Sequence, residues 1–246
     1  MTESEWVACI DPTRMLGFVR QRLSERKQRL FAVACCRRIW PLFLYEDSRQ
    51  AVEAAQRFAE GMARKNELRG YYHGGLMALE ECAARFRSVA PHSAISSAQA
   101  AANAAEERLL WACDDLPDPQ FDPAVAAAAA AREHARQLRR RPEEGARAGK
   151  WAEVTERRCQ SDILRDIVGN PFRQMILDRS WLTWNGGVVK SLAEIVYEGE
   201  VVDRLPILAD ALEEAGCTDT KILEHLRGPG PHVKGCWVVD ALLDKK

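Results

Sequence analysis

The chain has 246 residues, of which 47% are hydrophobic and 29% are charged, and its formal net charge is −1. This length can bury a real core in one large domain or two small ones, and the composition is globular rather than disordered. The near-zero charge argues against a dedicated nucleic-acid-binding protein, because such proteins are usually basic overall. Alanine, the strongest helix former, is abundant, so we predict an all-α fold, a multi-helix bundle with a smaller C-terminal helical unit.

Hydropathy and the N-terminal residues indicate the cellular compartment in which we expect the protein. No window of eighteen uninterrupted apolar residues is present, so we expect no membrane span. Residues 1–9 are acidic and lack the apolar stretch of a secretion signal. We therefore expect a cytoplasmic protein with reduced, mostly buried cysteines. They occupy positions 9, 35, 36, 82, 113, 159, 217 and 236.

Helix-capping signals begin at the second residue. Thr2 and Glu5 have the spacing of a capping box, and Asp11 followed by Pro12 is typical of a second helix start. Two adjacent glycines at 74–75 cost about 2 kcal/mol relative to alanine in a helix interior, so we predict a break or kink there. The helices expected in this half cover 24–40, 49–63, 66–87, 93–113 and 123–140.

A charged stretch at 139–150, RRRPEEGARAGK, is the best internal boundary because it contains a proline and two glycines. We predict an alanine-rich helical bundle over 1–141 and an aromatic-rich helical unit over 150–246, packed on the first. In the second unit Asp203 is the expected N-cap of a helix that Gly216 ends. The other expected segments are helices over 151–168, 188–197, 219–227 and 232–243, and an extended segment over 172–184.

Charge is unevenly distributed along the chain. Residues 14–38 contain eight basic residues and one acid, whereas residues 190–224 contain nine acids and three bases. We interpret these segments as two solvated faces, which attract each other within the fold or across a dimer. The alternative is a face that binds polyanions through arginines, for which we expect only weak, non-specific DNA binding, at or above about 10⁻⁶ M. The candidate binding residues on this face are Arg26, Arg29, Arg37 and Arg38.

Cys217, His225, His232 and Cys236 are the strongest candidates for chemistry. Two thiolates and two imidazoles suit tetrahedral zinc, and four protein ligands would make a structural site. His232 and Cys236 are four residues apart, which places them on one face of the predicted last helix. The spacing is not that of a standard zinc finger. We therefore expect core cysteines and locally paired histidines, with Cys236 and Trp237 buried and at least one histidine exposed, and we keep structural zinc as the alternative.

Catalytic signatures are scarce. The chain has no G-x-S-x-G, Walker loop, G-x-G-x-x-G or H-E-x-x-H motif. A Cys–His nucleophilic pair drawn from the four residues above has no orienting group or oxyanion hole that the sequence identifies. We assign no catalytic residue, and an enzyme is the least supported class.

Aromatic residues gather in the C-terminal part, at Phe172, Trp181, Trp184, Tyr197 and Trp237. Tryptophan is costly to leave exposed, so we expect most of them to form the core of that unit. One or two on the surface would line a groove for a protein partner, and Trp181 and Trp184 are the candidates.

Several longer motifs resemble one bacterial family. They are EW at 5–6, DP at 11–12, ML at 15–16, RLF at 29–31, CCRRIW at 35–40, LRDI at 164–167, GNPF at 169–172, DRLPILADAL at 203–212 and GPGPHVKGCWVVD at 228–240. Together they resemble a large set of paralogous, uncharacterised proteins of planctomycete bacteria. The resemblance covers both ends of the chain and implies no activity. Residues 204–216 are also similar to a short bacterial companion domain found beside repeat arrays, which favours an interaction role by analogy.

The sequence thus indicates a non-enzymatic helical interaction or adaptor protein of the cytoplasm, with a protein partner and without nucleic acid or membrane. The alternatives are a zinc-stabilised helical module and a nucleic-acid-associated regulator that uses the N-terminal arginines.

Overall fold

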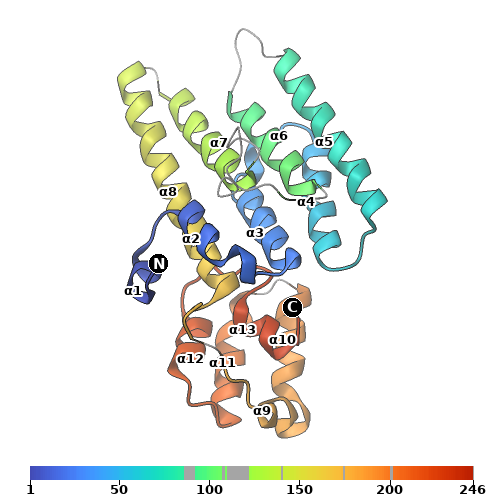
Figure 1. Cartoon of the computed structure of the whole chain (residues 1–246), viewed down its shortest axis with the longest axis vertical. Coiled ribbons are helices and arrows are strands. Elements are labelled where there is room, and N and C mark those ends of the chain that lie inside the picture. The colour runs from blue at the N-terminus through green and yellow to red at the C-terminus, as the bar shows by residue number, and fades with distance from the viewer. Residues whose placement is uncertain are drawn as a thin grey trace. The chain divides into compact units, whose positions relative to one another are not determined.

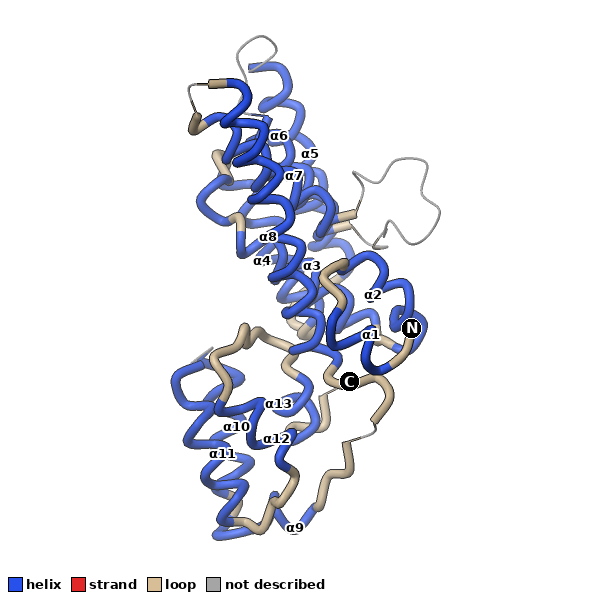
Figure 2. Tube along the Cα trace, turned by 90° about the vertical axis from the view of Figure 1, so that its left-hand side faces the viewer, coloured by secondary structure: helices blue, strands red, loops and turns tan. Residues whose placement is uncertain are grey.

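The computed structural model describes residues 1–85, 92–106, 109, 122–139, 141–173, 175–199 and 202–245. All regular structure in these ranges is helical, with no strand, which confirms the all-α prediction (Figures 1 and 2). The α-helices are α1 Glu3–Ala8, α2 Pro12–Val19, α3 Glu25–Arg38, α4 Glu46–Ala59, α5 Lys65–Arg85, α6 His92–Ala105, α7 Pro123–Gln137, α8 Pro142–Val168, α9 Arg179–Thr183, α10 Val188–Gly199, α11 Leu205–Glu214, α12 Thr220–Arg227 and α13 Trp237–Leu242.

Contacts divide the chain into two compact units, unit 1 (Met1–Ser161) and unit 2 (Asp162–Lys246). The sequence instead places the boundary within 139–150, where the structure has the start of α8. Pro142 opens this helix, because the first helical position needs no backbone N–H. Gly145 and Gly149 lie on the side of α8 that meets α7, so here glycine serves helix packing rather than a linker.

The capping predictions of unit 1 are confirmed. The Thr2 backbone N–H donates to Glu5 Oε2 over 2.8 Å, and the Glu5 N–H donates to Thr2 Oγ1 over 3.2 Å. Asp11 accepts from the backbone N–H groups of Thr13 and Arg14 at the start of α2. These contacts satisfy N–H groups that have no partner within the helix.

Alanine forms much of the core of unit 1. Small side chains let helices approach closely, and these alanines of α6 and α7 are buried: Ala98, Ala100, Ala101, Ala102, Ala104, Ala105, Ala124, Ala126, Ala127, Ala128 and Ala130. The break predicted at 74–75 is wrong, because α5 is continuous there. A Cβ on Gly75 would lie 3.2 Å from Ala102 Cα and 3.5 Å from Ala51 Cβ. Close packing of α4, α5 and α6 thus explains this glycine.

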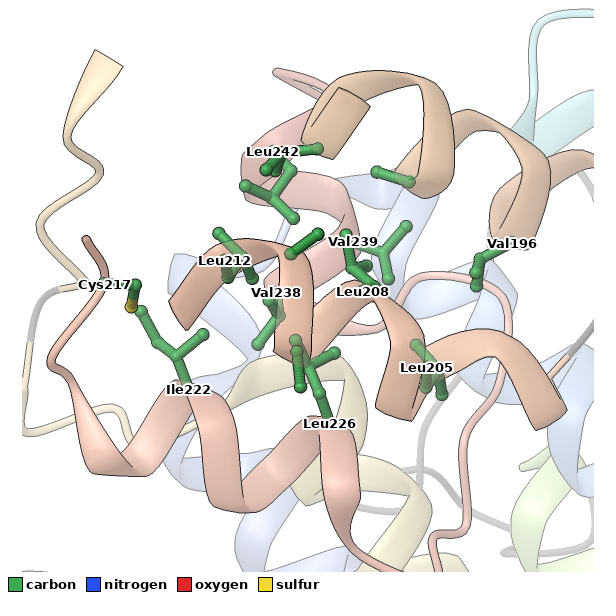
Figure 3. Close-up of a cluster of buried hydrophobic side chains, with 14 of the residues drawn as sticks. Val196, Leu205, Leu208, Leu212, Cys217, Ile222, Leu226, Val238, Val239 and Leu242 are labelled. Atoms are coloured by element: carbon green, nitrogen blue, oxygen red, sulfur yellow. The ribbon is translucent and has the colours of Figure 1, made fainter. Parts of the chain in front are cut away.

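An aliphatic cluster fills the core of unit 2, as Figure 3 shows. It draws on α10, α11, α12 and α13, and its fully buried members include Leu208, Leu212, Ile222, Leu226 and Val238. This cluster fixes the ends of α12 and α13, on which the site described below depends.

Three local predictions in unit 2 need correction. The segment expected to be extended contains α9, which Asp178 caps by accepting from the Ser180 N–H over 2.8 Å. Asp203 is not a cap: it lies in a 3-10 turn before α11, and Arg204 holds the N-cap position without a side-chain hydrogen bond. The last helix begins at Trp237 rather than at 232. The cap predicted at Gly216 is confirmed by its φ of 96°.

Candidate metal centre

Unit 2 brings three of the four predicted ligands together and replaces the fourth. Asp166, His225, His232 and Cys236 each offer one ligand atom, and these atoms all lie within 4.8 Å of one another. We call this group the Asp166 cluster. Cys217 is not in it.

The last turn of α8 supplies Asp166. Ile163 and Ile167 are buried on either side of it in the sequence, so the same helix face carries this carboxylate inward, where the residue is 2% exposed. The Val233 backbone N–H donates to Oδ2 over 2.9 Å, which fixes the carboxylate orientation. Oδ1 remains directed at the two histidines.

The loop between α12 and α13 supplies His232. Gly230 has a φ of 88°, and a Cβ there would lie 2.9 Å from the His232 backbone nitrogen, so only glycine suits this turn. The side chain of His232 is 5% exposed. Its Nε2 lies 3.1 Å from the carbonyl oxygen of Gly228, and its Nδ1 lies 3.2 Å from Asp166 Oδ1.

These two contacts determine which ring nitrogen of His232 carries the hydrogen. A carbonyl oxygen can only accept, so Nε2 carries the hydrogen that it donates to Gly228. In the neutral ring Nδ1 then presents a lone pair to Oδ1 of Asp166, which is also an acceptor. Two acceptors at this distance require either a proton on Nδ1 or a cation among the ligand atoms. A metal-bound histidine commonly has this pattern, with one nitrogen on the metal and the other donating to a carbonyl.

Without a metal, a proton on Nδ1 of His232 would satisfy the contact with Asp166. Burial lowers the pKa of His232, but the hydrogen bonds to Asp166 and Gly228 outweigh it and hold the pKa above its ordinary value. Burial likewise raises the pKa of Asp166, and the hydrogen bonds from the two histidines and the Val233 N–H lower it further than burial raises it. Opposite charges therefore stabilise each other in this pocket.

The other two members come from the end of α12 and the residue before α13. His225 Nε2 lies 3.1 Å from Cys236 Sγ and 3.2 Å from Asp166 Oδ1, so one nitrogen faces both groups. The Trp237 ring covers His225, with their ring centroids 5.3 Å apart. Burial, together with the nearby Asp166 carboxylate, raises the pKa of the Cys236 thiol well above its ordinary value.

The arrangement fits a tetrahedral ion more closely than a nucleophilic pair. Zinc bonds of about 2.0–2.3 Å place ligand atoms roughly 3.3–4 Å apart. The longest separation, 4.8 Å, exceeds this range by less than about 1 Å. A buried thiol with a raised pKa is a poor nucleophile, which argues against the Cys–His alternative. Asp166, His225 and His232 also line a surface pocket with residues 228–231, which gives an ion a path inward.

Cys217 lies in the aliphatic core beside Ile222, as Figure 3 shows. It follows the Gly216 cap, and its backbone N–H donates to the Leu212 carbonyl over 2.9 Å. The side chain therefore serves as a small buried hydrophobe, as the core interpretation predicted. The predicted shared helix face of His232 and Cys236 is wrong, because residues 232–236 precede α13.

Sequence reasoning missed Asp166. The signal that could have found it is an acid on the apolar face of a helix, in the last turn. A carboxylate at a helix C-terminus is unfavourable with the helix dipole and costly to bury without a cationic partner. The exposure predictions for the other residues were partly wrong: Cys236 is buried, but Trp237 is only partly buried, and neither histidine is exposed.

The four candidate arginines have partners within unit 1. Arg29 is fully buried and donates to the carbonyl oxygens of Ala104 and Glu106 over 3.0 and 2.7 Å. The other three also pair with side chains: Arg26 with Glu60 at 3.1 Å, Arg37 with Gln56 at 2.7 Å, and Arg38 with Glu156 at 2.9 Å. These contacts give each of the four arginines a partner within unit 1, and polyanion binding stays a prediction.

The candidate tryptophans also have internal roles. Trp181 is 8% exposed within the core of unit 2, and Trp184 packs against that core. Tyr197 belongs to the core as well, while Phe172 is 39% exposed. Most of the aromatic residues thus pack as predicted.

The cysteines in the described ranges are free, and Cys113 lies outside those ranges. Within the described residues, no helix is both long and apolar enough to cross a membrane. No protein-family model, curated protein or solved structure matches this chain. The resemblance to planctomycete proteins therefore stays a prediction.

Proposed function

We propose that unit 2 is a zinc-stabilised helical module and that the protein is a non-enzymatic adaptor of the cytoplasm. The observation that carries the metal is the convergence of one sulfur, two ring nitrogens and one carboxylate oxygen within 4.8 Å. In the neutral cluster, acceptor atoms face one another at 3.2 Å, and a divalent cation would satisfy them together in place of a proton on His232.

The ligand chemistry favours zinc over the common hard cations. Magnesium and calcium select sets made of oxygen atoms, whereas a thiolate with two imidazoles suits zinc. Four protein ligands fill a tetrahedron and leave no position for substrate, which is the pattern of a structural site. This supports an adaptor rather than an enzyme.

The metal would hold three segments of unit 2 together. Asp166 lies in the last turn of α8, His225 lies in the last turn of α12, and His232 and Cys236 lie in the connection to α13. That connection has no helix or strand of its own, so metal binding would supply folding free energy for it. A reducing cytoplasm would keep the Cys236 thiol available as a ligand.

Elemental analysis of the purified full chain tests the proposal. We expect one zinc per chain, and cobalt substitution should give the intense visible spectrum of a tetrahedral thiolate site. Cys236→Ser and Asp166→Asn should each lose the metal. Cys217→Ala is the matched control, because Cys217 is a buried cysteine outside the cluster, and it should retain the metal.

Two results would overturn the metal proposal. One is a chain that neither contains zinc nor takes it up after refolding with zinc. The other is equal loss of metal from Cys217→Ala and Cys236→Ser while both variants keep their helical circular dichroism, since this would mean that the cluster does not hold the ion.

A further inference from the structure

The outer face of α8 in unit 1 carries a strongly exposed tryptophan. Trp151 is 72% exposed, and Val154, one turn further along, is 47% exposed. Large apolar side chains grouped on a surface indicate an interaction site, and tryptophan is among the residues that contribute most to protein interfaces.

Three basic residues flank this apolar pair on the same side of the helix. Counted from Arg147, the positions of Lys150, Trp151, Val154 and Arg158 are i+3, i+4, i+7 and i+11, which form one helical stripe. All five side chains are exposed. We call these five residues the α8 stripe.

The three cations of the α8 stripe differ in their ion pairing from other arginines of this region. Arg157 pairs with Asp11 at 2.6 Å, and Arg132 of α7 pairs with Glu153 at 3.5 Å. Arg147, Lys150 and Arg158 make no ion pair with another described residue. Their positive charge is therefore available to a partner.

We propose that the α8 stripe is a docking surface for an acidic amphipathic helix of a protein partner. Apolar residues spaced three and four apart on that helix would cover Trp151 and Val154, and flanking glutamates or aspartates would meet the cations. A protein fits better than nucleic acid, because the exposed Trp151 and the aliphatic Val154 lie at the centre of the stripe. This proposal does not rest on the metal centre.

A synthetic peptide tests the surface. The probe is a fluorescein-labelled helical peptide with leucines at i, i+3, i+4 and i+7 and glutamates elsewhere, and its isomer carries lysines in place of the glutamates. Fluorescence anisotropy with the full chain should show saturable binding of the glutamate peptide only. Trp151→Ala should weaken it by about tenfold or more. Met77→Ala is the control, because Met77 is 68% exposed on α5, and it should bind as the parent does.

A charge reversal makes the test independent of stability. The variant Arg147→Glu, Lys150→Glu, Arg158→Glu should lose the glutamate peptide and gain the lysine peptide, which a merely unfolded chain would not do. Equal binding of both peptides by the parent, no binding of the glutamate peptide, or an unchanged affinity in Trp151→Ala would overturn the proposal. So would Trp151-dependent binding of an oligonucleotide in place of the peptide, or a self-association that Trp151→Ala abolishes.

Discussion

Arg29 in unit 1 and His232 in unit 2 are both polar side chains in poorly exposed surroundings, yet their hydrogen-bond balance differs. The Arg29 donors meet two carbonyl oxygens, and its guanidinium also pairs with Glu25. The free nitrogen of a neutral His232 meets only another acceptor, the Asp166 carboxylate. Two of the Arg29 donors thus have acceptors within the chain, whereas the two facing acceptors at His232 need a proton or an added cation between them. Matching donors to acceptors therefore marks a place where a cation can bind, which residue type alone does not.

Removal of the metal should change stability more than any of the substitutions below. A strong chelator should destabilise unit 2 by about 4 kcal/mol, which is the linkage expected when free zinc exceeds its dissociation constant a thousandfold. Hydrogen exchange should show lost protection in α12 and α13 and little change in α3 to α7. Unchanged protection in unit 2 after complete metal removal would contradict the proposed role of the cluster.

Arg29→Met should destabilise unit 1 and leave unit 2 unchanged, the reverse of what metal removal should do. Hydrogen bonds from charged groups contribute about 1.5–3 kcal/mol, and this change removes two of them while it keeps most of the side-chain volume. We expect unit 1 to lose about 3 kcal/mol in denaturant unfolding, with unchanged metal content. The exposed Arg37→Met is the control and should cost less than about 1 kcal/mol. Equal losses for the two variants would mean that burial of Arg29 contributes nothing.

Gly75→Ala should destabilise unit 1 by up to about 2 kcal/mol. Helix propensity alone predicts a gain of about 1 kcal/mol, but the new Cβ would press on the Ala102 backbone, and overpacking costs about 1–3 kcal/mol. Thermal unfolding decides between the two signs. A higher melting temperature would show that α5 and α6 can separate without cost.

Gly70→Ala should change the free energy of unfolding least, and it should stabilise rather than destabilise unit 1. The same helix carries Gly70, but a Cβ there meets nothing within 4 Å. Only helix propensity changes, so we expect a gain of up to about 1 kcal/mol in the free energy of unfolding. A loss at this position would point to a role of the α4–α5 surface that packing does not explain.

Capping signals in the sequence predicted several helix starts, whereas contacts between distant residues were not predicted. Thr2, Asp11 and Asp219 act on backbone groups within three residues, so their roles are visible in the order of residues. Gly75 acts through Ala102 on another helix, and this contact cannot be read from the local sequence. Two adjacent glycines therefore predicted a helix break at 74–75, where the fold has close helix packing.

The candidate metal centre shows the same division. His225, His232 and Cys236 are close in sequence, so residue type and spacing alone could propose them as one group. Asp166 precedes them by 59 residues or more, and only the fold brings it to His232 at 3.2 Å. Cys217 was chosen for its residue type, but the Gly216 cap and the Ile222 side chain hold it in the core.

The seam of alanine and glycine where α4, α5 and α6 meet has a consequence for how this protein can evolve. A Cβ on Gly75 would lie 3.2 Å from Ala102 Cα and 3.5 Å from Ala51 Cβ, and both alanines are fully buried. A larger side chain at Gly75 must therefore shift the neighbouring helix, and alanine neighbours offer little volume to give up in compensation. Divergent copies of this bundle should therefore keep small residues along the whole seam, or change several of them together with the helix spacing.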